Sequence, residues 1–267
     1  MNKTLAALSF FTRLPFWRLR DIPAESYKRV VELWPLAGWL TGGIAGGVFF
    51  LAGSVLPAMV AAALAITSRL LLTGALHEDG LADFFDGFGG GGKDRSRILA
   101  IMKDSRIGSY GVIALVMYFI VWVSTVASMP GITGALAILV TDTWSKSCSA
   151  FIIDFLPYAR TAETSKNKLV YNPLPVPSAL LCLLIGVFPM LLFLKPIAML
   201  AGIAPICTTA IMVIWLRNRL GGYTGDCCGA LFVMSELSML VVLSAMAGSE
   251  QLPLVTAHSA LLRLLPS

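Results

Sequence analysis

Three aspartates spaced for a shared helical face stand out in a chain that is otherwise mostly apolar. Asp79, Asp83 and Asp86 fall at positions i, i+4 and i+7, so a helix here would project all three carboxylates from one side. Like charges placed this closely repel one another unless a cation neutralises them, and hard oxygen ligands favour Mg²⁺ or Mn²⁺. The spacing therefore predicts a divalent metal site.

Basic residues follow the acids within the same polar segment, Leu76–Gly111. Four consecutive glycines, Gly89 to Gly92, predict a flexible loop, and five basic residues come after it: Lys93, Arg95, Arg97, Lys103 and Arg106. Positive charge beside a metal suits a substrate that carries several phosphates. Arg97, Lys103 and Arg106 are the predicted phosphate ligands, and the alternative is a solvated loop of mixed charge between two helices.

Two titratable residues lie just before the aspartates. An imidazole titrates near neutrality, so His77 could accept the proton of an attacking hydroxyl. Its neighbour Glu78, together with Asp83, completes the set of catalytic candidates. A lone histidine is more often a structural hydrogen-bonding residue, and a metal-bound aspartate could serve as the base instead.

A second glycine-rich polar segment, LGGYTGDCCGA, begins at Leu220. Its acid, Asp226, could bind a second cation or orient a ribose hydroxyl. The Thr224 hydroxyl and the backbone N–H of Gly225 could receive phosphate oxygens. The five cysteines of the chain show no metal-ligand spacing, and we interpret them as small buried apolar residues.

The composition indicates a membrane protein. Of 267 residues, 57% are hydrophobic and 13% are charged, with a mean hydropathy of +0.81, well outside the range of soluble domains. The net charge of +5 does not indicate nucleic-acid binding, because the basic residues flank apolar spans instead of forming a patch on a soluble face. We therefore expect the lipid bilayer, and no nucleic acid, as a partner.

Seven apolar runs are each about 20 residues long, enough to cross the hydrocarbon layer. They lie near 36–56, 58–76, 110–129, 132–156, 176–194, 197–216 and 228–247. The predicted fold is an all-α, polytopic membrane helix bundle forming a single domain over 1–267. Residues 1–30 are expected to form an amphipathic segment at the membrane interface, with a disordered tail as the alternative, and 77–109 a cytoplasmic catalytic loop.

The distribution of Lys and Arg predicts the orientation. With a cytoplasmic N-terminus, 16 of the 20 basic residues lie on the cytoplasmic side, as the positive-inside rule requires. The acidic run and the loops near 160–168 and 217–219 then share that side, where they can converge on one site. We expect an inner-membrane protein whose site faces the cytoplasm.

Two basic residues lie inside predicted spans, where charge is costly and usually functional. Lys146 follows Asp142 by four residues, so the two could form a structural ion pair. Arg69 must have a partner that the sequence does not identify. The first span also carries glycines at a spacing that permits close packing, either within the bundle or in a homo-oligomer: Gly38, Gly42, Gly43, Gly46 and Gly47.

Two long motifs, HEDGLADFFDGFGGG and ILAIMKDSRIGSYG, resemble those of the cobalamin synthase family, integral membrane enzymes of late vitamin B12 assembly. TRLP at Thr12–Pro15, WPLAG at Trp34–Gly38 and the segment Leu220–Ala230 are similar to the same family. The resemblance spans nearly the whole chain. Phe84 and Lys146 depart from the family pattern, which puts substrate contacts in question more than the family.

The resemblance implies a transferase that joins adenosylcobinamide-GDP to α-ribazole or its 5′-phosphate and releases GMP. It implies Mg²⁺ held by the three aspartates, with Lys103 and Arg106 on phosphate and Asp226 in the site. The first alternative is a lipid enzyme of the CDP-alcohol phosphotransferase type, whose motif has Arg where Asp83 follows Ala82. The second is an ion or metabolite transporter, which would place its acids near the bilayer midplane.

Overall fold

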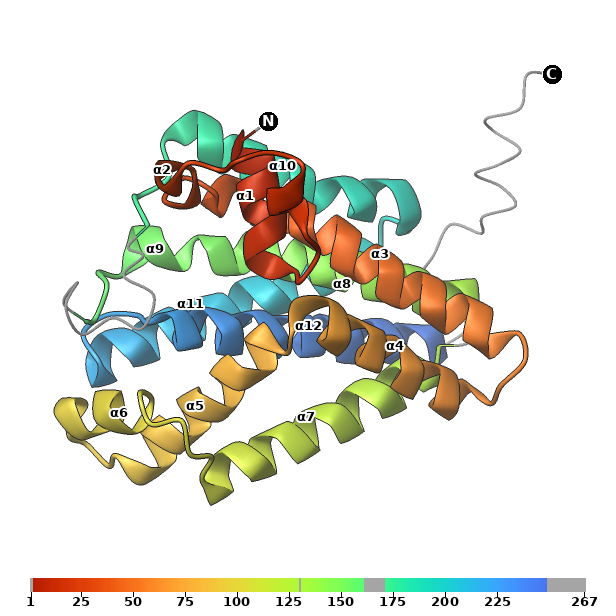
Figure 1. Ribbon diagram of the computed structural model, residues 1–267. Coiled ribbons are helices and arrows are strands. Elements are labelled where there is room, and N and C mark those ends of the chain that lie inside the picture. Colours follow the sequence, from red (N-terminus) through yellow and green to blue (C-terminus); the bar gives the residue numbers. More distant parts are fainter. Residues whose placement is uncertain (1, 130, 161–170, 249–267) are drawn as a thin grey trace.

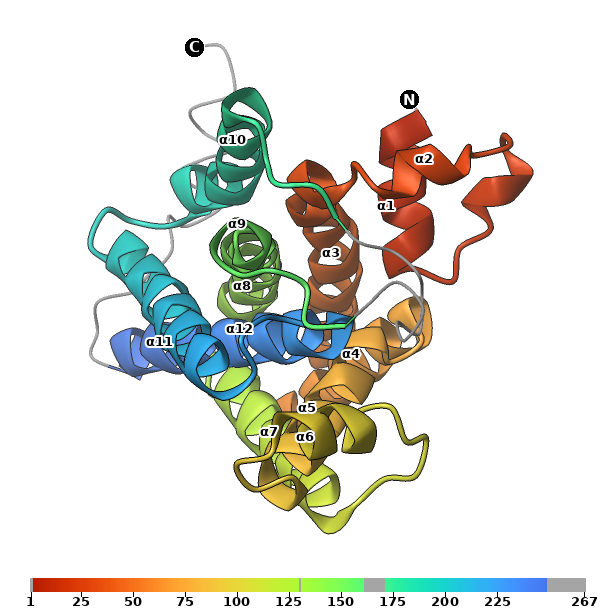
Figure 2. The ribbon, with the colours of Figure 1, turned by 90° about the vertical axis from the view of Figure 1, so that its left-hand side faces the viewer.

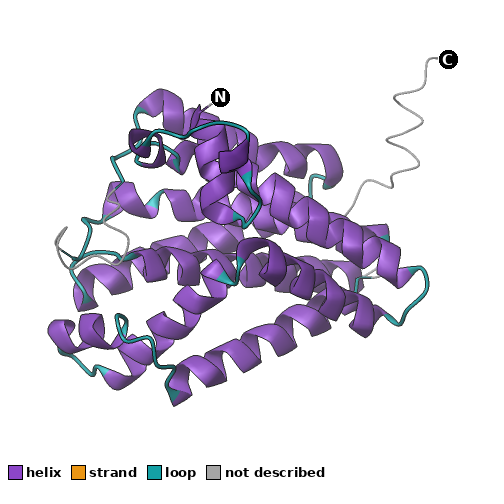
Figure 3. Cartoon of the chain, viewed as in Figure 1, coloured by secondary structure: helices purple, strands orange, loops and turns teal. Residues whose placement is uncertain are grey.

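The computed structural model describes residues 2–129, 131–160 and 171–248. Every regular element in these ranges is helical (Figure 3), which confirms the all-α class. The elements are α1 (Asn2–Phe11), α2 (Ala24–Tyr27), α3 (Trp34–Gly53), α4 (Ala58–Thr73), α5 (Leu76–Gly90), α6 (Arg95–Ile101), α7 (Ser109–Ala127), α8 (Ile132–Ala150), α9 (Ile152–Phe155), α10 (Val176–Phe193), α11 (Ile203–Arg219) and α12 (Gly225–Gly248).

Six stretches of the described chain are helical, long and apolar enough to cross a membrane, and the α4–α5 pair would make a seventh if it is one broken span. The helix limits agree with the predicted spans to within about five residues. Most of these helices expose large apolar side chains on their outer faces, as lipid-facing surfaces do. The chain is therefore a multi-pass membrane protein.

Helix α8 is the centre of the bundle. Figure 2 shows it end-on, with α3, α10, α11 and α12 around it. Gly38, Gly42 and Gly46 of α3 face it so closely that an added Cβ would come within 3 Å of its backbone or side chains. Gly43 and Gly47 face open space. Three of the five predicted glycines thus pack the bundle from within.

A sharp turn separates α4 from α5, whose axes differ by 91°. Gly74 ends α4 with φ +68°, and Ala75 follows with φ +57°. Ala75 is alone among the described non-glycine residues in this left-handed region, which a side chain rarely adopts. The N-terminal segment braces the turn, because the backbone N–H of Arg13 donates to the Leu72 carbonyl at 2.7 Å.

The segment 77–109, which was predicted as a catalytic loop with a helix under its aspartates, is largely helical. It contains all of α5 after its first residue and the whole of α6. Gly89 and Gly90 still belong to α5, and Gly89 is needed because a Cβ there would meet the Tyr110 ring at 2.5 Å. Asp94 then starts α6 by accepting hydrogen bonds from the backbone of Ser96 and Arg97.

The N-terminal residues pack against the bundle as well as lying at its edge. Ala6, Ala7 and Phe11 of α1 are buried, and Lys3 forms an ion pair with Glu32 at 2.7 Å. Trp17, in the following turn, is about half exposed. The predicted interfacial segment therefore also forms one wall of the molecule's interior.

The polar connections meet at one end of the bundle, on the left in Figure 1. Tyr223 exchanges backbone hydrogen bonds with the 157–159 segment at 2.8 and 2.9 Å. Arg95 donates to the Ala159 carbonyl at 3.0 Å, and Arg219 donates to the Gly92 carbonyl. The polar segment before α6, residues 157–160 and residues 219–223 therefore converge, whereas most of the predicted loop near 160–168 lies outside the described residues.

Candidate functional site

Two glycines bring the two polar motifs together where α5 crosses α12. A Cβ at Gly80 would meet the Asp226 carbonyl oxygen at 3.0 Å, and a Cβ at Gly229 would meet the His77 carbonyl oxygen at 3.2 Å. Helix backbones approach this closely only where side chains are absent. The crossing therefore places Asp79, next to Gly80, beside the first turn of α12.

A cavity of about 290 Å³ opens beside this crossing. It contains four of the predicted site residues, His77, Asp79, Gly225 and Asp226. Its remaining walls come from α1, α3, α5, α8, α12 and the residues just before α10: Phe10, Phe11, Trp34, Leu76, Gly80, Lys146, Ser149, Tyr171, Cys228, Gly229 and Phe232. We take this cavity as the candidate active site.

Aromatic rings from five parts of the chain form a connected wall of the cavity. Phe11 lies 5.6 Å from Trp34, edge to face, and 5.6 Å from the stacked ring of His77. Tyr171 packs against Trp34 at 5.5 Å, and Phe232 lies 4.4 Å from His77. Phe10 packs against Tyr171. Sequence reasoning missed these rings, although WPLAG, which carries Trp34, was among the family motifs.

His77 is the candidate catalytic residue that the structure places best. Its side chain is buried, and neither ring nitrogen has a hydrogen-bond partner in the described part of the chain. A buried imidazole without partners loses its hydration and gains no hydrogen bond that would offset the cost. Both nitrogens are thus buried beside the cavity without a partner among the described residues.

Asp86, one of the three predicted metal ligands, has a structural role that the spacing did not predict. Its side chain is buried and accepts hydrogen bonds from the backbone N–H groups of Gly108 and Gly111 at 2.7 and 2.8 Å. These groups open α7, whose first N–H donors have no partner within the helix. Asp86 therefore caps α7 from another helix.

The remaining carboxylates fit a site for Mg²⁺ that is completed by substrate. Asp79 is exposed and lines the cavity with the partly buried Asp226, whereas Asp83 is partly buried and does not line the cavity. No group of three metal-ligating side chains occurs in the described ranges. Mg²⁺ usually takes one or two carboxylates together with waters and substrate phosphates, and Asp79 and Asp226 are the cavity carboxylates that could hold it.

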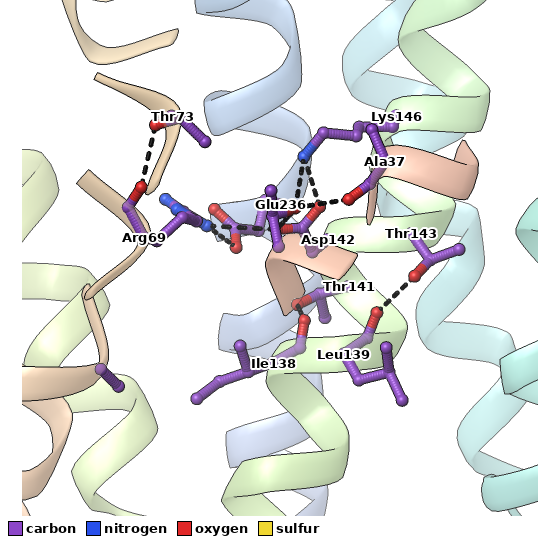
Figure 4. A network of polar contacts seen from close by, with 12 residues as sticks. Ala37, Arg69, Thr73, Ile138, Leu139, Thr141, Asp142, Thr143, Lys146 and Glu236 are labelled. Atoms are coloured by element: carbon purple, nitrogen blue, oxygen red, sulfur yellow. Dashed lines mark hydrogen bonds and ion pairs between the residues drawn. The ribbon is translucent and has the colours of Figure 1, made fainter. Parts of the chain in front are cut away.

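Glu78 belongs to a buried charge network instead of the cavity lining (Figure 4 shows part of it). Arg69 of α4 bonds to Glu78 at 3.2 Å, to Glu236 of α12 and to the Tyr118 hydroxyl of α7. All of these side chains are buried. These residues are the partners of Arg69 that the sequence did not identify. Glu78 therefore has a structural role in holding the start of α5.

Lys146 connects this network to the cavity. It forms the predicted ion pair with Asp142, and its ammonium also lies 3.3 Å from the Thr41 hydroxyl. Thr41 donates to Asp142 at 2.9 Å. The ammonium also lies 3.8 Å from the centre of the Phe232 ring, a cation–π contact. Lys146 therefore contributes positive charge to the floor of the cavity, which the sequence did not reveal.

The first turn of α12 is fixed by Thr224 and Arg160. The Thr224 hydroxyl accepts from the Cys227 backbone N–H at 3.3 Å and is fully buried, so Thr224 caps the helix and is not open to phosphate. Arg160 lies 3.5 Å from the Asp226 carboxylate and donates to the Leu99 carbonyl at 3.4 Å. Arg160 thereby ties Asp226 to α6.

The predicted phosphate ligands lie outside the cavity. Arg97, Lys103 and Arg106 are exposed residues in or just after α6. Arg106 pairs with Asp104 at 2.7 Å, and its hydrogen bonds lower the pKa of Asp104 to about 2. The structure therefore brings these residues to the same end of the molecule as Asp226, but not into its cavity.

Comparison with known proteins agrees with this arrangement. The family model described as cobalamin-5-phosphate synthase matches residues 3–244. The chain belongs to this family. An adenosylcobinamide-GDP ribazoletransferase of Shewanella baltica (strain OS185) is 38% identical over 244 residues, which cover 90% of this chain and 92% of the relative.

A second relative of the same name, from Shewanella oneidensis, is 36% identical over 247 residues and is covered to 93% of its length. No solved structure matches the chain. The match includes α1, α5 and α12, so every wall of the cavity lies inside the family region.

Proposed function

We propose that this protein is a membrane transferase that joins the activated corrinoid adenosylcobinamide-GDP to ribazole or its 5′-phosphate and releases GMP. Family membership and the names of both relatives support the reaction. The observation that carries the proposal is the crossing at Gly80 and Gly229, which unites Asp79 and Asp226 in one cavity. We place the cavity on the cytoplasmic side of the inner membrane.

The reaction is a phosphoryl transfer. A ribazole hydroxyl attacks the phosphorus that carries the corrinoid arm, and the bond from that phosphorus to the GMP oxygen breaks. The attacking hydroxyl loses its proton, and His77 is the side chain placed to accept it, because its nitrogens are free and it lines the cavity. The departing GMP carries the electron pair of the broken bond.

The carboxylates and bases of the site would share the charge of the phosphates. Asp79 and Asp226 would hold Mg²⁺, which would neutralise charge on the departing phosphate. Arg160 orients Asp226 through their ion pair, and Lys146 provides positive charge within the cavity. Arg97, Lys103 and Arg106 would bind the GDP-activated substrate where it extends beyond the cavity.

Purified protein in lipid nanodiscs should release GMP when both substrates and Mg²⁺ are present. The matched control omits ribazole, which separates transfer from simple hydrolysis. Excess EDTA should stop the reaction, and added Mg²⁺ should restore it. Absence of GMP, or equal GMP release without ribazole, would disprove the proposed activity. Turnover in excess EDTA would disprove the requirement for a divalent metal ion.

A further inference from the structure

The cavity contains more unsatisfied polar groups than the proposed chemistry needs. Besides His77, the indole Nε1 of Trp34 is buried and has no hydrogen-bond partner among the described residues. Both side chains line the cavity, and both contact the ring of Phe11 at 5.6 Å. Trp34 and His77 both contact the Phe11 ring and both lack hydrogen-bond partners within the described chain. Such buried, unsatisfied polar groups indicate that a polar ligand binds among the aromatic residues.

The walls around these groups select a flat molecule. Phe10, Phe11, Tyr171 and Phe232 present rings from three separate parts of the chain. Aromatic side chains bind planar rings through stacked and edge-to-face contacts. An acyl chain would fill such a cavity but would leave the Trp34 and His77 nitrogens without partners, so lipid is a poor match.

The size of the cavity excludes the larger substrate. At about 290 Å³, it lies at the lower end of the range of roughly 300–1,000 Å³ that drug-sized ligands occupy. A nucleoside fits such a volume, whereas a corrinoid macrocycle with its side chains does not. The corrinoid must therefore lie outside the cavity.

We infer that the aromatic cavity binds the base of the ribazole substrate, a dimethylbenzimidazole. This inference rests on the proposed function for the identity of the nucleoside. The unsubstituted ring nitrogen of a benzimidazole is an acceptor, and Trp34 Nε1–H is a donor without a partner. The methylated ring meets the apolar rings, and the ribose extends toward His77 and Asp79.

Guanine from the other substrate is also flat but suits the cavity less well. Its edge carries several donors and acceptors, each of which needs a partner when buried. The aromatic wall offers the Trp34 N–H as a donor, and the two cavity aspartates are engaged in the proposed chemistry. The benzimidazole base has a single free ring nitrogen, which needs only the one donor that Trp34 supplies.

Equilibrium binding of ribazole to the full-length protein in nanodiscs, without the second substrate, tests the inference. Trp34→Phe keeps a ring and removes the donor, so the Kd for ribazole should rise roughly three- to tenfold. The matched control is Trp39→Phe in the same helix, whose indole donates to the Ile185 carbonyl at 3.2 Å and does not line the cavity. That variant should bind ribazole like the wild type.

Competition against the wild-type protein provides a test that does not depend on folding of a variant. Free 5,6-dimethylbenzimidazole should displace ribazole, and guanosine should not. Displacement by guanosine alone, or an unchanged ribazole Kd in a folded Trp34→Phe variant, would overturn the inference even if the wild type releases GMP. Conversely, benzimidazole binding without GMP release would refute the proposed activity and leave only the assignment of the cavity to a benzimidazole base standing.

Discussion

At the scale of single residues, the three predicted metal ligands separate into different roles. Asp79 lines the cavity, Asp83 lies one turn further along α5, and Asp86 caps α7. Helical spacing predicts correctly that residues at i, i+4 and i+7 share a helix. It does not show that residues 22 and 25 positions further on will donate hydrogen bonds to the last of them.

Substitution of Asp86 should lower stability, whereas substitution of Asp79 should lower activity. Asp86→Ala leaves two α7 donors without partners, so the protein should lose roughly 1–3 kcal/mol of stability. Asp79→Asn changes an exposed side chain and should leave stability unchanged while activity falls by roughly a hundredfold or more. Thermal unfolding and GMP release, measured for both variants, check this assignment. Wild-type stability in Asp86→Ala would show that the cap contributes little.

Arg106 should act on one substrate. The pKa of Asp104 is about 2 because Arg106 donates to it. A lowered carboxyl pKa means that the pair is intact above about pH 4 and is lost only as the pH falls through about 2. Between pH 6 and 9 the pair therefore imposes no pH dependence, and Asp104→Asn should free Arg106 for phosphate.

Kinetics with each substrate varied in turn provide the measurement. Arg106→Ala should raise the KM for adenosylcobinamide-GDP, and Asp104→Asn should lower it, with the KM for ribazole unchanged in both. Arg18→Ala removes an exposed basic residue that is not on α6 and serves as the control. An effect of Arg106→Ala confined to ribazole would mean that the basic residues serve the other substrate.

At the scale of helices, the lengths of the spans were predictable because the thickness of the hydrocarbon layer sets them. The position and angle of the break between α4 and α5 were not predictable from the sequence. No proline marks the break, and Gly74 followed by Ala75 lies within an apolar run. Ala75 is left-handed at a turn that the N-terminal segment contacts through Arg13 and Leu72, a contact between distant residues that local sequence does not encode.

Adjacent glycines in α3 provide a test of helix packing. In Gly42→Ala, the new methyl would lie 2.9 Å from the Asp142 Cβ, so α3 and α8 must separate. We expect a loss of roughly 1–3 kcal/mol, the usual range for overpacking. Gly43→Ala faces open space and should cost nothing or slightly stabilise the helix. Equal unfolding temperatures for the two variants would contradict the packing described for this helix pair.

At the scale of the whole molecule, the polar connections lie at one end and the α3–α4 turn at the other (Figure 1). Charge counting predicted the shared end. It did not predict the cavity, because α1, α5 and α12 meet there through contacts between residues more than 60 positions apart, such as Phe11 with His77 and His77 with Phe232. Such contacts depend on how the helices pack together, which the periodicity of a single sequence does not contain.

Cysteine labelling in oriented membrane vesicles should establish the orientation. With the exposed native Cys207 replaced by Ser, a probe at Lys93→Cys should react from the cytoplasmic side. A probe at Ser54→Cys, in the α3–α4 turn, should react from the opposite side. Both positions are exposed, and the Lys and Arg distribution motivates the expectation. Labelling of Lys93→Cys only from outside would reverse the topology and separate the site from cytoplasmic nucleotides.

The buried charge network also has a consequence for the order of synthesis and membrane insertion. Arg69 leaves the ribosome 167 residues before Glu236, its partner on the last helix. An unpaired arginine in a membrane helix costs about 2.5–3.5 kcal/mol at insertion, and Glu78, nine residues later in the chain, is the first of its acidic partners to be synthesised. Arg69 and Glu78 would therefore enter the membrane together as an early pair. The final arrangement, and the cavity with it, can form only after translation has reached α12.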